Sequence, residues 1–228
     1  NKKTVFAGSV SGGLWKTTDI TATPAIWTPV NDFLSNLAIS SICQDPRPGF
    51  RNNMYLCTGE SYFNADAGQG VGVFKSTDGG TTWTFLASTS AYTFCTRILC
   101  DFQGNVYLGT RNGLYRSNDG GSSWTGITPS GLASSRVCDM EISSTATQAR
   151  LHVVTGISNS QAYRYTDDPA GVSTGSGWNA PTTPFPSYNN RAEIAVLGSV
   201  LYALPVNNSS QIPEIYKSVD GGATWAIT

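Results

Sequence analysis

A strongly patterned stretch lies at residues 73–83, where apolar positions lead through polar ones to a turn signal and then to a tryptophan. Val73 and Phe74 suit a pleated, half-buried strand. The Asp-Gly-Gly run at 78–80 predicts a tight turn, because glycine accepts positive φ and aspartate accepts hydrogen bonds from its own turn. The stretch therefore predicts a strand, a turn and a second strand that begins at Trp83.

This pattern recurs four more times along the chain. Two copies are tight, at 114–124 and 215–225, and two are looser, at 14–27 and 162–178. All copies share an aromatic residue, a basic residue, two further residues, an aspartate and a later tryptophan. The aspartates are Asp19, Asp78, Asp119, Asp167 and Asp220, and the tryptophans are Trp27, Trp83, Trp124, Trp178 and Trp225.

A second repeat precedes each copy, as a short strand with an aromatic residue or histidine at its second position. These strands are expected at 5–7, 54–56, 106–108, 151–153 and 201–203. Repeats of about 40–50 residues built only of strands are typical of propeller blades. The sequence therefore predicts an all-β propeller of four-stranded blades, with the basic residue on the third strand and the tryptophan at the start of the fourth.

Five blades are expected within a single domain that spans residues 1–228. The first begins at its second strand, near residue 4, and lacks the innermost strand. The others are expected at about 37–86, 92–127 and 137–184, and from about 192 onward. Because an open ring leaves strand edges exposed, we expect the domain to be incomplete at one or both ends. Its intact ring would have six to eight blades, completed by further blades or domains of the same longer chain.

Composition narrows the possible partners. Lys and Arg total 14 against 15 Asp and Glu, a net charge of −1, which argues against a nucleic-acid partner. No apolar run is long enough for a membrane span. The five cysteines form no metal-binding spacing and are expected to be mainly buried thiols, and no cofactor or metal is predicted. His152 occupies the aromatic position of its repeat and is expected to pack rather than react.

Ser-Thr-Asp-Gly-Gly-Thr-Thr-Trp at 76–83 resembles the Asp-box, or BNR repeat. That repeat marks propellers of sialidases, sortilin-type receptors, xyloglucanases and a photosystem II assembly factor. The segment 59–67 is similar to large secreted propeller proteins of Bacteroidetes-type bacteria. The resemblance implies a secreted or cell-surface protein of bacterial source. The repeat aspartates are expected to satisfy backbone N–H groups of their turns, and the tryptophans to pack between blades.

Two groups of residues are candidates for ligand binding, on the face formed by the loops between the second and third strands. Within the loop 60–70, Glu60, Tyr62, Asn64 and Asp66 combine carboxylates with an aromatic ring, which suits sugar or peptide contact. The alternative is a purely structural loop in which Asn64 and Asp66 cap turns.

The second group comprises Arg97, Arg136 and Arg191, near the starts of three consecutive inner strands. Converging guanidinium groups could bind a carboxylate, as the arginine trio of sialidases does. However, the segment 96–99 lacks the aromatic residue and proline of the sialidase signature. The alternative is that these arginines pair with Asp139, Glu141 or Glu193.

The leading functional prediction is non-catalytic binding of a glycan or a protein through the loop face. A glycoside hydrolase of sialidase or xyloglucanase type is the first alternative. The xyloglucanase segment that resembles residues 7–13 carries a catalytic aspartate where this chain has Val10, which cannot act as an acid or nucleophile. An assembly factor that docks a partner protein is the second alternative.

Overall fold

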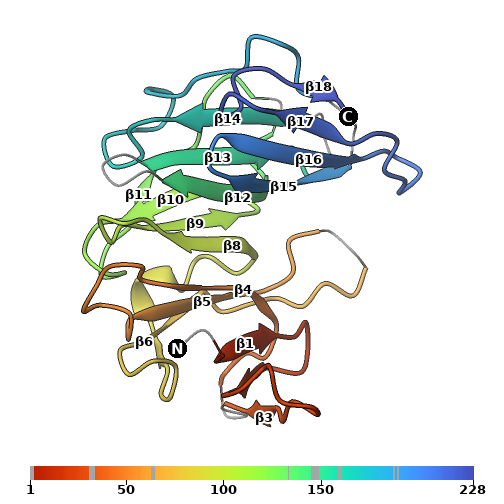
Figure 1. Cartoon of the computed structure of the whole chain (residues 1–228). Helices are drawn as coiled ribbons and strands as arrows, with labels where there is room; N and C mark the ends of the chain where they lie inside the picture. Colours follow the sequence, from red (N-terminus) through yellow and green to blue (C-terminus); the bar gives the residue numbers. More distant parts are fainter. Residues whose placement is uncertain are drawn as a thin grey trace. The chain divides into compact units, whose positions relative to one another are not determined.

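The computed structural model describes residues 3–30, 34–62, 65–132, 134–144, 149–158, 161–186, 188 and 190–228. The chain forms two compact units, Asn1–Ile98 and Leu99–Thr228, and each is described by itself. The described residues contain strands, one 3₁₀ turn and no α-helix (Figure 1). The predicted all-β class is therefore confirmed.

The first unit contains two antiparallel sheets. One has the order β1-β2-β3, with β1 (Val5–Gly8), β2 (Leu14–Thr17) and β3 (Thr28–Pro29). The other has the order β4-β5-β6-β7, with β4 (Ile39–Gln44), β5 (Met54–Thr58), β6 (Val73–Ser76) and β7 (Thr84–Phe85), followed by the 3₁₀ turn Ala87–Thr89. Among the described residues, the first sheet therefore has three strands and the second has four.

The division between the units falls within β8 (Cys95–Cys100), which belongs to a sheet with β9 (Val106–Thr110), β10 (Gly113–Ser117) and β11 (Thr125–Gly126). The next sheet joins β12 (Val137–Ser144), β13 (Ala149–Thr155) and β14 (Ala162–Thr166). The last sheet joins β15 (Arg191–Leu197), β16 (Val200–Val206), β17 (Tyr216–Ser218) and β18 (Ala226–Ile227). Each sheet is a meander in which sequential strands are neighbours.

The strand register aligns the two repeats seen in the sequence. The aromatic residue of each second strand lies opposite the basic residue of the third, in the pairs Phe6–Lys16, Tyr55–Lys75, Tyr107–Arg116 and Tyr202–Lys217. In three sheets the lysine Nζ lies over the ring, 5.1 Å from the centroid of Phe6, 5.4 Å from that of Tyr55 and 5.6 Å from that of Tyr202. Each of these pairs places a cation over the face of the aromatic ring, where the charged end of the lysine can stay near water.

Within each unit, neighbouring sheets pack face to face through side chains that alternate along the strands. In the second unit, Tyr107 and Leu114 share one buried cluster with Met140, Leu151 and Val153 of the following sheet.

A second cluster continues this packing toward the last sheet, where Val154 and Tyr163 share a core with Leu201, Ala203 and Trp225. Asp139 adds a polar link between these two sheets, since its buried carboxylate accepts the backbone N–H of Ile194 at 2.9 Å. In the first unit, Leu14 packs with Leu56 and Phe74 in the same way.

The tryptophan directly before β18 tests how much this packing contributes to stability. Trp225 is 6% exposed and meets the rings of Tyr163 and Phe185 edge-on, each with centroids 5.2 Å apart. Trp225→Ala is expected to lower the free energy of unfolding by about 3–5 kcal/mol, because it leaves a cavity between two sheets. Chemical denaturation measures this. The matched control is Trp15→Ala, since Trp15 is 38% exposed, and an equal loss in both variants would contradict the account.

Candidate functional site

In the tight repeats, each aspartate carboxylate accepts hydrogen bonds from groups of its own turn. Asp78 accepts backbone N–H groups of Thr81 and Thr82 at 3.0 and 2.9 Å, and the hydroxyls of Ser76 and Thr82 at 2.8 and 2.6 Å. The hydrogen bond from the Thr82 hydroxyl is the main reason that the pKa of Asp78 lies well below its usual value. Asp119 and Asp220 make the same bonds to Ser123 and Thr224. With their oxygens engaged inside the turn, these carboxylates have little capacity left for chemistry.

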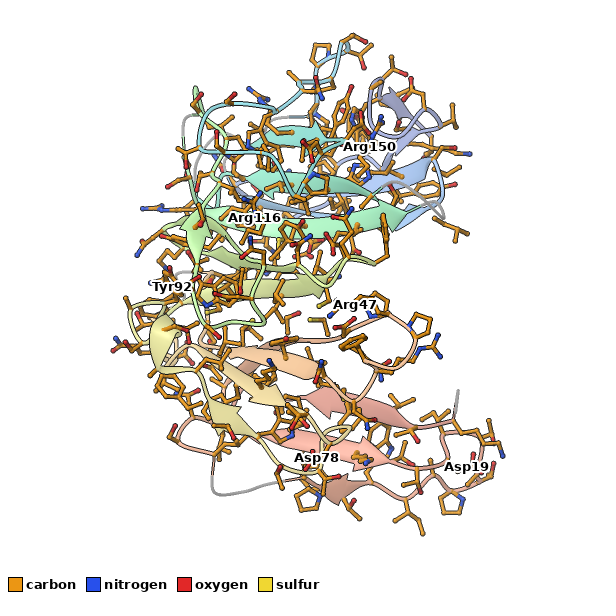
Figure 2. All side chains as sticks on the ribbon, turned by 90° about the vertical axis from the view of Figure 1, so that its left-hand side faces the viewer. Asp19, Arg47, Asp78, Tyr92, Arg116 and Arg150 are labelled. Carbon is orange, nitrogen blue, oxygen red and sulfur yellow. The ribbon has the colours of Figure 1, made fainter. Side chains whose placement is uncertain are left out.

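The first and fourth copies differ from this arrangement. Asp19 accepts a hydrogen bond from the backbone N–H of Thr21 at 3.0 Å. It also forms an ion pair with Lys3, with 3.0 Å between Lys3 Nζ and Asp19 Oδ2. Asp19 and Asp78 are labelled in Figure 2. In the fourth copy, the register sets His152 opposite Tyr165, so Tyr165 rather than Arg164 occupies the basic position.

In the other copies the aspartate follows the basic position by three residues. The turn aspartate of the fourth copy is therefore Asp168 and not Asp167. Asp168 accepts the backbone N–H of Gly171 at 2.9 Å and donates its own backbone N–H to the Thr166 hydroxyl at 3.2 Å. Asp167 instead pairs with Arg150, which donates from Nε and Nη2 at 2.6 and 2.9 Å. The predicted role of Asp167 in the turn was therefore wrong by one residue, because Tyr163-Arg164 imitates the aromatic–basic pair of the other copies.

His152 is fully buried within the second unit. Its Nδ1 lies 2.6 Å from the Tyr163 hydroxyl and its Nε2 lies 2.9 Å from the Ser143 hydroxyl. Burial, together with the smaller effect of the nearby Arg150 guanidinium charge, lowers the pKa of His152 to about 3. A neutral, enclosed imidazole of this kind belongs to the packing between strands and has no route to a substrate.

The loop that carries Glu60 and its neighbours is held at both ends. Thr58 Oγ1 donates to the carbonyl of Gly72 at 2.8 Å, and the backbone N–H of Glu60 donates to the carbonyl of Gly68 at 2.9 Å. Gly59 has φ +100, and an added Cβ would lie 2.5 Å from the Thr93 carbonyl oxygen.

Between these anchors, Tyr62 is 36% exposed and Asp66 is exposed, whereas Glu60 is half-buried. Asn64 lies outside the described residues. The loop therefore presents an aromatic ring and a carboxylate on a restrained backbone.

The three predicted arginines are divided between the units. Arg97 lies in the part of β8 that belongs to the first unit, whereas Arg136 and Arg191 belong to the second. All three are half-buried. Arg136 Nη1 donates to the carbonyl of Ile157 at 3.2 Å, which ties it to the segment between β13 and β14. Convergence of the three guanidinium groups stays a prediction.

A basic residue that the sequence analysis missed lies beside Arg136. Arg111 stands in the turn between β9 and β10, and its pKa is lowered by burial and by the charge of Arg136. Two guanidinium groups therefore lie near each other where β12 begins. Arg111 could have been found from its place in a loop between second and third strands.

Two buried polar groups occupy the same end of the fourth sheet. Thr155 ends β13 and is 1% exposed, and Gln161 precedes β14 and is 4% exposed. Thr155 Oγ1 and Gln161 Nε2 have no hydrogen-bond partner among the described residues, although Gln161 Oε1 accepts the backbone N–H of Tyr188 at 3.1 Å. Buried donors without partners are uncommon in folded proteins. We call Arg111, Arg136, Thr155 and Gln161 the Arg136 edge.

The described residues add little support for a glycoside hydrolase or another catalytic role. Val10 lies in the turn between β1 and β2 and is 60% exposed. Within the described part of the chain, no group of three His, Cys, Asp or Glu side chains could hold a metal ion. All five cysteines lie among the described residues and none of them forms a disulfide; Cys57, Cys95 and Cys138 are buried. None of the described helical segments is long and apolar enough to cross a membrane.

Comparison with known proteins places this geometry in a wider group. A family model described as the DUF6242 beta propeller domain matches residues 2–228. A comparison with curated proteins gave no match.

Among solved structures, the Niastella koreensis GH74 enzyme has a TM-score of 0.68 and 22% identity, and the similarity covers 100% of this chain but 35% of that one. YCF48 bound to D1 peptide has a TM-score of 0.57 and 14% identity, covering 100% of this chain and 78% of that one. The extracellular domain of BT4673 from B. thetaiotaomicron has a TM-score of 0.64 and 12% identity, covering 100% of this chain and 26% of that one. These similarities show a shared fold.

The buried imidazole makes a pH-dependent contribution to stability that can be measured. The folded state keeps His152 neutral down to about pH 3, whereas in the unfolded chain the imidazole is protonated below about pH 6.5. Between these values the unfolded state binds more protons, so the free energy of unfolding decreases as pH falls. From pH 7 to pH 5, wild type is expected to lose about 1–2 kcal/mol more than His152→Phe. Urea denaturation at both pH values checks this, and equal losses would refute a neutral buried His152.

Proposed function

Because the chain belongs to the DUF6242 β-propeller domain family, we propose that it is a non-catalytic binding domain that recognises a glycan or a protein through the loop ends of its sheets. The observation that carries the proposal is Val10. An exposed, uncharged side chain occupies the position at which the segment resembling the xyloglucanases needs its catalytic aspartate. The chain also spans 35% of the length of the GH74 enzyme it is similar to.

Two surfaces support recognition at the loop ends. In the first unit, Tyr62 and Asp66 extend from a loop that is anchored at both ends, which reduces the entropy lost when a ligand is bound. In the second unit, the Arg136 edge combines two guanidinium groups with the buried donors of Thr155 and Gln161. Such groups suit the carbonyl, carboxylate or hydroxyl oxygens of a peptide or a sugar.

The comparisons are compatible with either class of ligand. The fold is shared with an enzyme of a glycoside hydrolase family and with YCF48, whose structure holds a D1 peptide. An extracellular location, secreted or at the cell surface, is part of the proposal and is supported by the similarity to the extracellular domain of BT4673. No nucleic-acid partner is proposed, since the net charge is −1.

A glycoside hydrolase is the second candidate. It is favoured by the similarity of the whole chain to the GH74 enzyme and by the presence of Glu60 and Asp66 in one loop. Hydrolysis of a glycosidic bond needs two carboxyl groups about 5–9.5 Å apart on either side of the scissile bond. Release of reducing sugar separates this candidate from the first.

The test combines binding with turnover. The chain is run through native gels that contain each of a panel of soluble polysaccharides, including xyloglucan, and is applied to an array of immobilised peptides. We expect retardation by a polysaccharide or capture by a peptide, with no reducing sugar released above the blank. Sugar release would replace the binding proposal with the hydrolase, and a chain that binds nothing in either panel would contradict both.

Variants then locate the binding surface. Tyr62→Ala and Arg136→Ala are each expected to weaken binding of the ligand found in the panel about tenfold or more if that side chain contacts it, the effect of losing about 1.4 kcal/mol at an interface. The matched controls are Phe50→Ala and Arg51→Ala, because both residues are exposed in the loop at the opposite end of β5. Wild-type affinity in both test variants, or equal weakening in the controls, would exclude the loop ends as the binding surface.

A further inference from the structure

Two cysteines meet in the interior of the first unit. Cys57 lies in β5 and Cys95 begins β8, and both are 0% exposed. Successive residues of a strand point to opposite faces of its sheet. Leu56 packs in the cluster that includes Leu14 of the first sheet. Cys57 therefore points to the other face, where its thiol lies in hydrogen-bonding contact with the thiol of Cys95.

Hydrogen bonds hold the chain segments around the two cysteines against each other. The Ser61 hydroxyl donates to the carbonyl of Phe94 at 3.0 Å. The backbone N–H of Gly70 donates to the carbonyl of Thr93 at 2.7 Å. The segment that follows the first cysteine and the segment that precedes the second are therefore fixed beside each other, so the contact between the thiols belongs to the fold.

The remaining neighbours of the two thiols suggest no other chemistry. Cys57 Sγ lies 3.4 Å from the Ser40 hydroxyl, and Cys95 Sγ donates to the carbonyl of Tyr92 at 3.2 Å. Tyr92 is labelled in Figure 2. Among the residues that the structure describes, no further Cys, His, Asp or Glu joins the pair to make a set of metal ligands. Two thiols in contact in this way have the arrangement that precedes a disulfide.

We propose that Cys57 and Cys95 become joined by a disulfide bond when the chain folds in an oxidising compartment. The proposal rests on the extracellular location proposed above, because disulfides persist outside the reducing cytosol. The bond links strands of two consecutive sheets, β5 and β8, which are not paired with each other. It also lies at the base of the loop 60–70, which carries Tyr62 and Asp66.

The bond forms by exchange with an external disulfide, such as oxidised glutathione or the disulfide of a thiol oxidase. The thiolate of one cysteine attacks the external disulfide, which forms a mixed disulfide and releases one thiolate. The thiolate of the second cysteine then attacks the mixed disulfide and releases the other. The chain gives up two protons and two electrons, and the oxidant takes them up as two thiols.

Burial determines when this exchange takes place. The hydrogen bond with Cys57 and the burial of the site raise the pKa of Cys95 well above its usual value. The attacking thiolate is therefore scarce in the folded chain, and the buried pair is closed to an external oxidant. The disulfide is consequently expected to form during folding, before the pair is covered.

Refolding in vitro tests the bond on the purified chain alone, so a negative result bears on the bond and not on ligand binding or location. The reduced, unfolded chain is refolded with oxidised and reduced glutathione, and the remaining thiols are alkylated in denaturant. All but two of the five cysteines are expected to be alkylated, against all five after refolding with a reductant. Trypsin places each cysteine in a different peptide, and mass spectrometry is expected to show peptide 52–75 linked to peptide 76–97.

Variants identify the pair. Cys57→Ala and Cys95→Ala are each expected to leave every remaining thiol free for alkylation. The matched control is Cys138→Ala, because Cys138 is also a buried strand residue, and this variant is expected to retain the link. Alkylation of all five wild-type cysteines, or a link that involves Cys43, Cys100 or Cys138, would overturn the proposal.

Thermal unfolding then tests whether the bond fits the native fold. A bond between residues 57 and 95 restricts the unfolded chain, so oxidised wild type is expected to melt about 5 °C or more above the reduced protein. Cys57→Ala and Cys95→Ala are expected to melt at the same temperature after either treatment. If oxidised wild type melted no higher than the reduced protein, the bond would not fit the native fold and the proposal would be wrong.

Discussion

The constraint on which this structure depends is that its sheets are apolar on both faces. Alternation places Tyr107 and Gly109 on one face of β9 and Val106 and Leu108 on the other, and all four residues are buried. A sheet with two apolar faces is stable only when a neighbour covers each of them. Sequential packing of similar meanders satisfies this requirement, and it explains why the repeat, rather than any single residue, determines the fold.

That requirement separates structural positions from positions available for binding. The two ends of each sheet are not covered by neighbouring faces. At one end, the turn between the third and fourth strands is closed on its own aspartate, as Asp78 and Asp119 show. At the other end, the loops between second and third strands vary in length and composition, so that recognition can change there without loss of the shared core.

Most of the strand pattern was readable from the sequence because each repeat combines period-2 alternation with a turn signal. The fourth copy was aligned wrongly by one residue, because Tyr163-Arg164 resembles the aromatic–basic pair of the other copies. In the strand register, Tyr165 occupies the position that the basic residue has in those copies. Only the backbone pairing could resolve this one-residue shift. The proximity of Arg111 and Arg136 was also beyond the sequence, since it depends on how a loop of one sheet meets the first strand of the next.

Hydrogen exchange of the wild-type chain tests most directly whether each sheet depends on being covered at both of its faces. The account predicts slow exchange of the backbone amides in β13 and β14, whose sheet contributes to a buried cluster on each of its faces, and faster exchange in β16 and β17, where Tyr202 and Ile215 are exposed. Equal protection of the two pairs of strands would contradict the account, because the uncovered face would then make no difference to the stability of its sheet.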